Sequence, residues 1–159
     1  MKPDTTVAMK KDVSPQPRLG IQLVMKNATA ALTFYSQVFG AEERMRLVEP
    51  SGRLGHAEML LGGVVLSIAD EYPEYGIVGP QSRGGATSLL NLSVDDVDAM
   101  AQRAIAAGAV LERPIKDEFY GDRVAHIQDP FGHRWSLSMR IEEVSPEEMQ
   151  RRFLKMVGG

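Results

Sequence analysis

The chain has 159 residues, of which 43% are hydrophobic and 25% charged, with a formal net charge of −3 and no cysteine. This composition is typical of one globular domain that buries a hydrophobic core. No apolar run approaches the ~18 residues of a membrane-spanning helix, and no Lys/Arg cluster alternates with aromatic residues, so we expect neither a membrane nor a nucleic-acid partner. Without cysteine there is no disulfide and no thiolate metal site. A small molecule or a second copy of the chain is the expected partner.

The first 17 residues are polar, contain three prolines and show no periodicity. We expect them to form a flexible extension outside the fold. The lysines near the start are followed by no apolar stretch, so this segment does not form a secretory signal, and we expect a cytoplasmic protein.

Residues 18–71 are expected to form a first module, a strand followed by a helix and three more strands. The run LGIQLVM is rich in strand-forming residues, and after it Asn27 can cap a helix that Gly40 ends. Leu32, Tyr35 and Phe39 share one face of this helix, which we interpret as core packing. Strands are expected at 43–50, 55–61 and 64–71, with turns at Ser51-Gly52 and Gly62-Gly63.

The segment 72–86, YPEYGIVGPQSRGGA, is expected to be a linker without helix or strand, and its length also suits a mobile flap. The same order of elements then returns in residues 87–140. A strand is expected at 87–94, a helix at 95–109 capped by Asp95 or Asp96 and closed by Gly108, and strands at 110–118, 122–129 and 133–140. Both helical segments end in Gly-Ala with matching spacing, so we predict an internal repeat.

Residues 141–159 are expected to contain a final helix. Ser145 as N-cap, Pro146 at the first helical position and Glu148 three residues past the cap form a capping box. Met149, Phe153 and Met156 share one face, which we expect to pack on the body of the domain or on a partner chain.

Several motifs point to a known superfamily. FYSQVFGA ends the first helix, VDDVDAMAQRAIAAGA opens the second module and YGDRVAHIQDPFGHRWSL closes it. In these motifs and in module order, residues 18–152 resemble the vicinal oxygen chelate superfamily of glyoxalases, extradiol dioxygenases, fosfomycin resistance enzymes and bleomycin resistance proteins. The string GHAEMLLGGVVLSIADEYPEYG, with YGDR and SPEEMQRR, is similar to its PhnB-like branch. The resemblance implies one α+β domain whose two βαβββ modules curl into half-barrels around a cleft, and a homodimer.

The resemblance also implies where a metal would bind. Metal enzymes of the superfamily take one ligand from the first strand and one, usually Glu, from the last strand of each module, and the metal polarises a chelating substrate. Matched position by position, these ligands fall at Gly20, Ser67, Leu89 and Ser136. None of these side chains is an imidazole or a carboxylate, and a shift of one residue in the first strands brings in no ligand. We therefore expect no metal at the usual site and no cofactor.

His133 follows the turn DPFG, in which Asp129 can cap, Pro130 fixes φ and Gly132 supplies unusual backbone angles. Successive side chains of a strand point to opposite faces. His133 and the cleft-facing Ser136 therefore point to opposite sides, and we predict a structural role for His133 rather than a ligand role.

Other polar side chains are predicted to face the cleft. The alternation of strand faces, combined with the resemblance, places two histidines and an acidic residue there, with amides from the first strand of each module. A tyrosine stands at the mouth of the strand that holds the second histidine. The predicted ligand-binding residues are Gln22, His56, Glu58, Asn91, Tyr120 and His126.

These residues allow several interpretations. In the first, His56 and Glu58 form a local hydrogen-bonded pair, His126 contacts backbone or water, and the cleft is partly filled. In the second, they orient a small ligand between apolar walls. In the third, His56, Glu58 and His126 form a displaced metal site. In the fourth, Glu58 with His56 performs acid–base catalysis.

Two functions remain as hypotheses. The favoured one is a metal-independent protein of the bleomycin-resistance type that binds a planar or oxygenated organic compound. The alternative is a glyoxalase-like lyase, isomerase or dioxygenase that uses a displaced metal or metal-free acid–base chemistry. The sequence leaves open which applies, and whether the cleft forms within one chain or between two.

Overall fold

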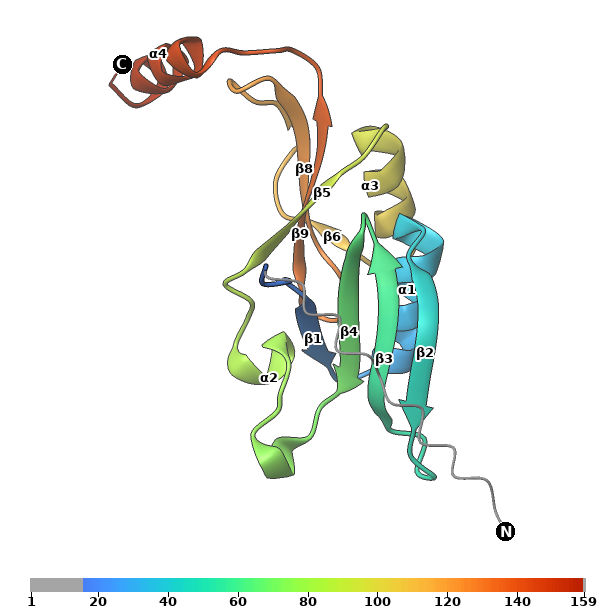
Figure 1. The fold of residues 1–159 in the computed structure, drawn as a ribbon. Coiled ribbons are helices and arrows are strands. Elements are labelled where there is room, and N and C mark those ends of the chain that lie inside the picture. Colours follow the sequence, from blue (N-terminus) through green and yellow to red (C-terminus); the bar gives the residue numbers. More distant parts are fainter. Residues whose placement is uncertain (1–15, 159) are drawn as a thin grey trace.

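A computed structural model describes residues 16–158, which form two βαβββ modules followed by a helix (Figure 1). The N-terminal sheet has the order β1-β4-β3-β2, and the C-terminal sheet has the order β5-β9-β8-β6, with β7 also paired to β8. Strands β1 and β4 are parallel neighbours, as are β5 and β9. The predicted α+β fold with tandem modules is confirmed.

The first module comprises β1 Ile21–Met25, α1 Ala28–Phe39, β2 Glu42–Val48, β3 Leu54–Leu61 and β4 Val64–Asp70. The second comprises β5 Leu89–Ser93, α3 Val97–Ala106, β6 Val110–Leu111, β7 Lys116–Asp117, β8 Asp122–Gln128 and β9 Arg134–Arg140.

The helix ends follow the predicted capping residues. The side chain of Asn27 accepts a hydrogen bond from the backbone of Ala30 at the start of α1, and Gly40 ends that helix with φ 74°. At α3 the cap is Asp96, whose carboxylate accepts from the backbone of Ala99.

One hydrophobic core joins the two modules. The buried side of α1 contacts α3, and both helices pack against the inner faces of the two sheets. Tyr35 of α1 lies against Trp135 of β9, with ring centroids 5.4 Å apart. Because both inner faces meet in this shared core, the outer face of each sheet is turned away from it.

The segment 110–118 differs from the prediction of one strand. It forms the short strands β6 and β7 with a bend between them, and Pro114 lies in the bend. Proline has no N–H to donate to a β-ladder, so pairing to β8 stops there and resumes two residues later.

The linker 72–86 is more ordered than predicted. It contains η1 Pro73–Tyr75 and α2 Pro80–Arg83, each too short to show a helical period in the sequence. Glu71 accepts hydrogen bonds from Gly79 N at 2.9 Å and Ser82 Oγ at 2.6 Å, and Gln81 donates to the carbonyl of Pro130. These contacts fasten the linker to both modules.

The final helix, α4 Pro146–Gly158, begins with the predicted capping box, in which Ser145 Oγ accepts from Glu148 N at 3.2 Å. Its apolar face contacts the body of the domain through Phe153, whose ring lies 5.9 Å from that of Phe119, and no residue of the helix is buried. Packing of this face on a partner chain stays a prediction. The predicted flexible extension, residues 1–17, lies almost wholly outside the described residues. Among residues 16–158, no helix has the length and apolarity needed to cross a membrane.

Candidate ligand-binding site

Two matching rows of polar side chains lie on the outer faces of the sheets. In the N-terminal sheet, Gln22 lies opposite Ser67, and Ser67 lies opposite Glu58. We call these three residues row 1. The C-terminal sheet repeats the arrangement at the same strands, and row 2 consists of Asn91, Ser136 and His126.

The strand pairing shows which first-strand residues lie beside Ser67 and Ser136. Gly20 precedes β1, and the residue beside Ser67 is Gln22. Leu89 lies opposite Arg134, and the residue beside Ser136 is instead Asn91. Gln22 and Asn91 each lie two residues further along the chain than Gly20 and Leu89, the positions that the resemblance suggested, and a shift of two residues keeps the same face of a strand.

A metal of the usual superfamily type does not fit the side chains of Gln22, Ser67, Asn91 and Ser136. Gln22 and Asn91 offer neutral amides and Ser67 and Ser136 offer hydroxyls, whereas divalent transition metals in such sites are held by imidazole and carboxylate. No three His, Asp or Glu side chains within residues 16–158 are grouped closely enough to hold a metal. One copy therefore does not assemble His56, Glu58 and His126 into the displaced site considered above.

His56 and Glu58 form the local pair predicted from their spacing. Nε2 of His56 lies 3.3 Å from Oε1 of Glu58, and both side chains are more than a third exposed. They project from β3 on the same outer face, two residues apart. The pair remains accessible to a ligand or to a second chain.

His126 contacts a residue that the sequence did not single out. A terminal nitrogen of Arg113 lies 2.9 Å from Nε2 of His126. Burial, followed by the charge of Arg113, lowers the pKa of His126 below its ordinary value. At neutral pH the imidazole is therefore uncharged. It accepts from Arg113 at Nε2, which leaves Nδ1 as a donor for another group.

Substituting Arg113→Gln is expected to raise the pKa of His126, because the variant removes a positive charge beside the imidazole. The pH titration of the His126 ring protons by NMR measures this directly. Arg44→Gln, on β2 of the other module, is the matched control and should leave the His126 titration unchanged. An unchanged or lowered pKa in Arg113→Gln would show that this contact does not form in solution.

Tyr120 stands just before β8 and is half-buried, with its ring 5.2 Å from that of Phe119. Burial, followed by the nearby charges of Glu118 and Asp122, raises the pKa of its hydroxyl. It therefore stays protonated at neutral pH and can donate a hydrogen bond. Tyr120 belongs to neither row.

His133 has a structural role, as predicted. Its ring nitrogen Nε2 lies 2.9 Å from the carbonyl of Val24 on β1, and its backbone N–H donates to Asp129. The hairpin also has the predicted chemistry, with Gly132 at φ 93° and the carboxylate of Asp129 capping the turn. His133 therefore links the two modules through backbone contacts.

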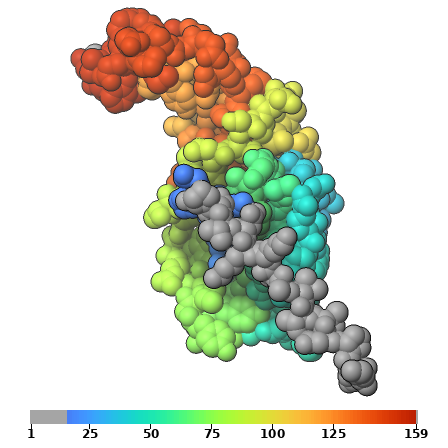
Figure 2. All heavy atoms as spheres, viewed as in Figure 1, coloured from blue at the N-terminus to red at the C-terminus, as the bar shows by residue number. Residues whose placement is uncertain are grey.

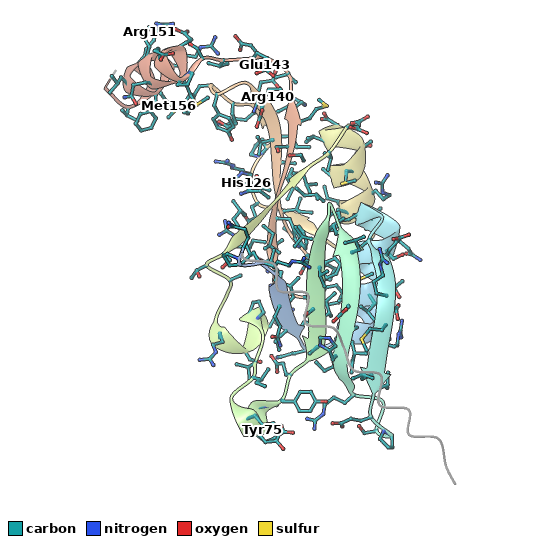
Figure 3. All side chains as sticks on the ribbon, viewed as in Figure 1. Tyr75, His126, Arg140, Glu143, Arg151 and Met156 are labelled. Carbon is teal, nitrogen blue, oxygen red and sulfur yellow. The ribbon has the colours of Figure 1, made fainter. Side chains whose placement is uncertain are left out.

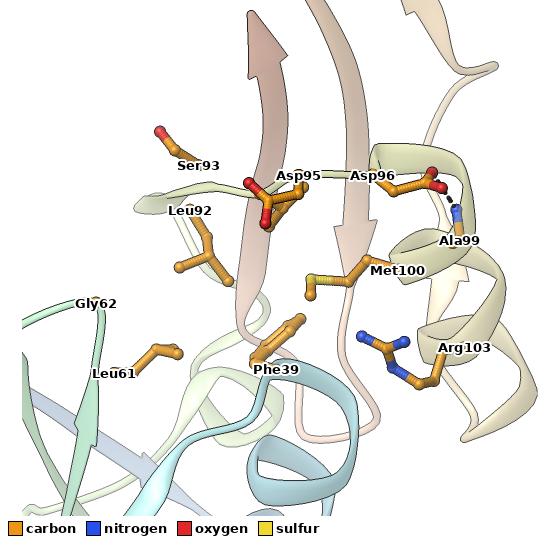
Figure 4. A pocket seen from close by; sticks show the side chains of 11 residues that line it. Phe39, Leu61, Gly62, Leu92, Ser93, Asp95, Asp96, Ala99, Met100 and Arg103 are labelled. Atoms are coloured by element: carbon orange, nitrogen blue, oxygen red, sulfur yellow. Dashed lines mark hydrogen bonds between the residues drawn. The ribbon is translucent and has the colours of Figure 1, made fainter.

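Gln22 of row 1 and Asn91 of row 2 line different cavities within the described part of one chain. Gln22 lines a cavity of about 370 Å³ beside the linker, and Asn91 lines one of about 290 Å³ between the modules. A larger hollow of about 450 Å³, bounded by Phe39, Leu92 and Met100, contains no residue of either row (Figure 4). In Figure 3, His126 points away from α3 and into the open.

Comparison with known proteins identifies the superfamily. The sequence profile of the Glyoxalase/Bleomycin resistance protein/Dioxygenase superfamily matches residues 19–137. The chain belongs to this superfamily. It is 37% identical over 141 residues to an uncharacterised Mycobacterium tuberculosis protein. The aligned region covers 87% of this chain and 83% of the relative.

Solved structures support the fold. The PhnB protein of Bacillus cereus matches with a TM-score of 0.64 and 16% identity, over 77% of this chain and 99% of that one. The fosfomycin resistance protein FosX of Listeria monocytogenes, in a complex with Mn(II) and sulfate, matches with a TM-score of 0.60 and 18% identity, over 87% and 98%. The resemblance to the superfamily with PhnB-like neighbours is thereby confirmed.

Arg113 is the residue of the site that sequence reasoning missed. It lies between β6 and β7, in the segment interpreted as one regular strand. The bend that brings it to His126 depends on the break in pairing at Pro114. A proline three residues after a short β-run was the signal for that break.

Proposed function

We propose that the protein binds a small organic molecule between two copies of the chain, with row 1 of one copy facing row 2 of the other. The supporting observation is that one copy holds the two rows on the outer faces of sheets whose inner faces share a core. A single copy leaves each half of the site open, so a second copy is needed to complete a cleft.

The chemistry of the two rows suits an oxygenated ligand. Row 1 offers an amide, a hydroxyl and a carboxylate, and row 2 offers an amide, a hydroxyl and an uncharged imidazole. Apolar side chains of the N-terminal sheet lie beside row 1, among them Met45 opposite Glu58. A few polar groups on an apolar wall are the usual features of a small-molecule site. A planar compound with oxygen or nitrogen acceptors is the expected ligand class.

The relatives support a ligand of this kind. The superfamily description includes bleomycin resistance proteins, and the structural neighbour FosX is a fosfomycin resistance protein. Binding by sequestration requires none of the missing metal ligands. A homodimer in the cytoplasm, as expected from the sequence, is part of this proposal.

A second candidate function is favoured by the His56–Glu58 pair. A carboxylate 3.3 Å from an exposed imidazole can hold that imidazole for proton transfer to a ligand in a metal-free lyase or isomerase. His56→Ala separates the candidates, because it removes the imidazole of this pair. Lost turnover with retained affinity would favour the enzyme, and lost affinity alone would favour binding.

The proposal is tested with a planar aromatic sulfonate, 1-anilinonaphthalene-8-sulfonate, followed by fluorescence. We expect a dimer by light scattering and saturable binding of the probe. Asn91→Trp, which places a large ring in row 2 at an exposed position, should abolish binding. Ile105→Trp, exposed on α3 and outside both rows, is the control. A monomeric protein, or probe binding that Asn91→Trp leaves intact, would contradict the proposal.

A further inference from the structure

Helix α4 is amphipathic and stands away from the domain. Figures 1 and 2 show it projecting beyond the end of the C-terminal sheet. None of its residues is buried, although its apolar side chains form one broad stripe. Four of these side chains are between 42% and 58% exposed, namely Phe153, Leu154, Met156 and Val157. Helices with such a stripe normally gain their stability by packing it against another surface.

Contacts from the middle of α4 fix the direction in which the helix projects. Arg152 donates to the carbonyl of Phe119 at 3.0 Å and forms ion pairs with Glu142 and Glu148. The guanidinium groups of Arg151 and Arg152 lower the pKa of Glu148 to about 2, so this carboxylate is charged at all ordinary pH values. The ring of Phe153 lies 5.9 Å from that of Phe119. Leu154, Met156 and Val157 of the stripe are more than half exposed.

A matching apolar surface lies on the outer face of the N-terminal sheet. Met45 and Leu47 of β2 lie opposite Glu58 and His56 of β3, which places all four side chains on that face. Met45, Leu47 and the nearby Val65 are 38%, 57% and 42% exposed. This surface and α4 lie at opposite ends of one copy, so a chain cannot cover its own sheet with its own helix (Figure 1).

We propose that α4 of one copy packs its apolar stripe on Met45, Leu47 and Val65 of a second copy. Charge favours this pairing, because Lys155 lies in the last turn of α4, whereas row 1 of the second copy includes Glu58. In a two-fold dimer the contact forms twice, since each copy offers both surfaces.

This inference rests on the proposed dimer and adds a partner for α4 within it. Row 1 lies directly beside the surface that α4 would cover, because Met45 is paired with Glu58. The helix of the second copy would therefore form a wall of the ligand site and limit the size of the ligand. A typical interface buries about 800 Å² on each partner, so the helix supplements the contact between the modules rather than replacing it.

The test is cross-linking in the full-length protein, which has no cysteine of its own. A Leu47→Cys chain and a Val157→Cys chain, each with its own tag, are co-expressed. The purified mixture is treated with a short bis-maleimide. We expect a covalent product that contains both tags. Ile105→Cys, at an exposed apolar position on α3, replaces Val157→Cys in the matched control and should give no such product.

The outcomes separate this inference from the proposed function. A mixed product with Val157→Cys and none with Ile105→Cys supports the placement of α4. A dimer by light scattering that yields no mixed product, with Leu154→Cys and Met156→Cys equally negative, overturns the placement and leaves the shared ligand site standing. A monomer overturns both.

Leu154→Glu should also weaken dimerisation by about tenfold or more, because it places a charge in the apolar contact.

Discussion

Replacing Asp129 by Ala is expected to lower the free energy of unfolding by about 3–5 kcal/mol. The carboxylate is 3% exposed and accepts four hydrogen bonds. Tyr35 Oη donates at 2.6 Å and Trp135 Nε1 at 2.9 Å, which joins α1 of the first module to β9 of the second. Removal of the acceptor leaves both side-chain donors unpaired in the core. The melting temperature should fall by about 6–20 °C.

Glu112→Gln provides the comparison for Asp129→Ala. Its carboxylate pairs with Arg134, but both side chains are between a fifth and a third exposed. Such partly exposed pairs contribute about 1 kcal/mol or less. Equal losses for the two variants in chemical denaturation would mean that the Asp129 cluster does not hold the modules together.

Gly79→Ala is expected to displace the linker from β1 and to lower the free energy of unfolding by about 1–3 kcal/mol. A Cβ atom at this position would lie 2.5 Å from the carbonyl oxygen of Val24 and 3.0 Å from Cα of Met25. Both obstacles are backbone atoms of a central element, so the linker must move instead. The hydrogen bond from Gly79 N to Glu71 should weaken with it.

Gly20→Ala is the matched control, because its Cβ would meet nothing closer than 3.9 Å. Limited proteolysis measures the displacement, and cleavage within residues 76–86 should accelerate in Gly79→Ala alone. Unchanged cleavage and stability would show that the linker does not pack tightly on β1. That result would agree with the mobile flap considered from the sequence.

The fold was predictable from the sequence because its signals are local. Asn27 and Gly40 bound α1, and paired glycines mark the β3–β4 turn. The exception was residues 110–118, where pairing rather than composition decides the strand ends. Pro114, between Arg113 and Ile115, cannot donate to the ladder, and pairing to β8 is interrupted around it.

The candidate site was predictable only in part. Alternation along the strands, combined with the resemblance, predicted that Glu58 and His126 face the cleft, and the structure places each on the outer face of its sheet. Strand register does not follow from alternation, since a shift of two residues keeps the same face. For that reason Gln22 and Asn91 were recognised as site residues but not as the partners of Ser67 and Ser136. The contact between Arg113 and His126 depends on a bend and had no periodic signal.

The most direct test of a site shared between two copies mixes two inactive variants. Gln22→Trp blocks row 1, and Asn91→Trp blocks row 2 at the equivalent exposed position of the second module. Each variant alone should fail to bind 1-anilinonaphthalene-8-sulfonate. Co-expressed, they should recover about one quarter of the wild-type sites, because half of the dimers are mixed and each mixed dimer holds one intact pair of rows. A site within one chain would be blocked in every copy, so no recovery in a dimeric mixture would contradict this account.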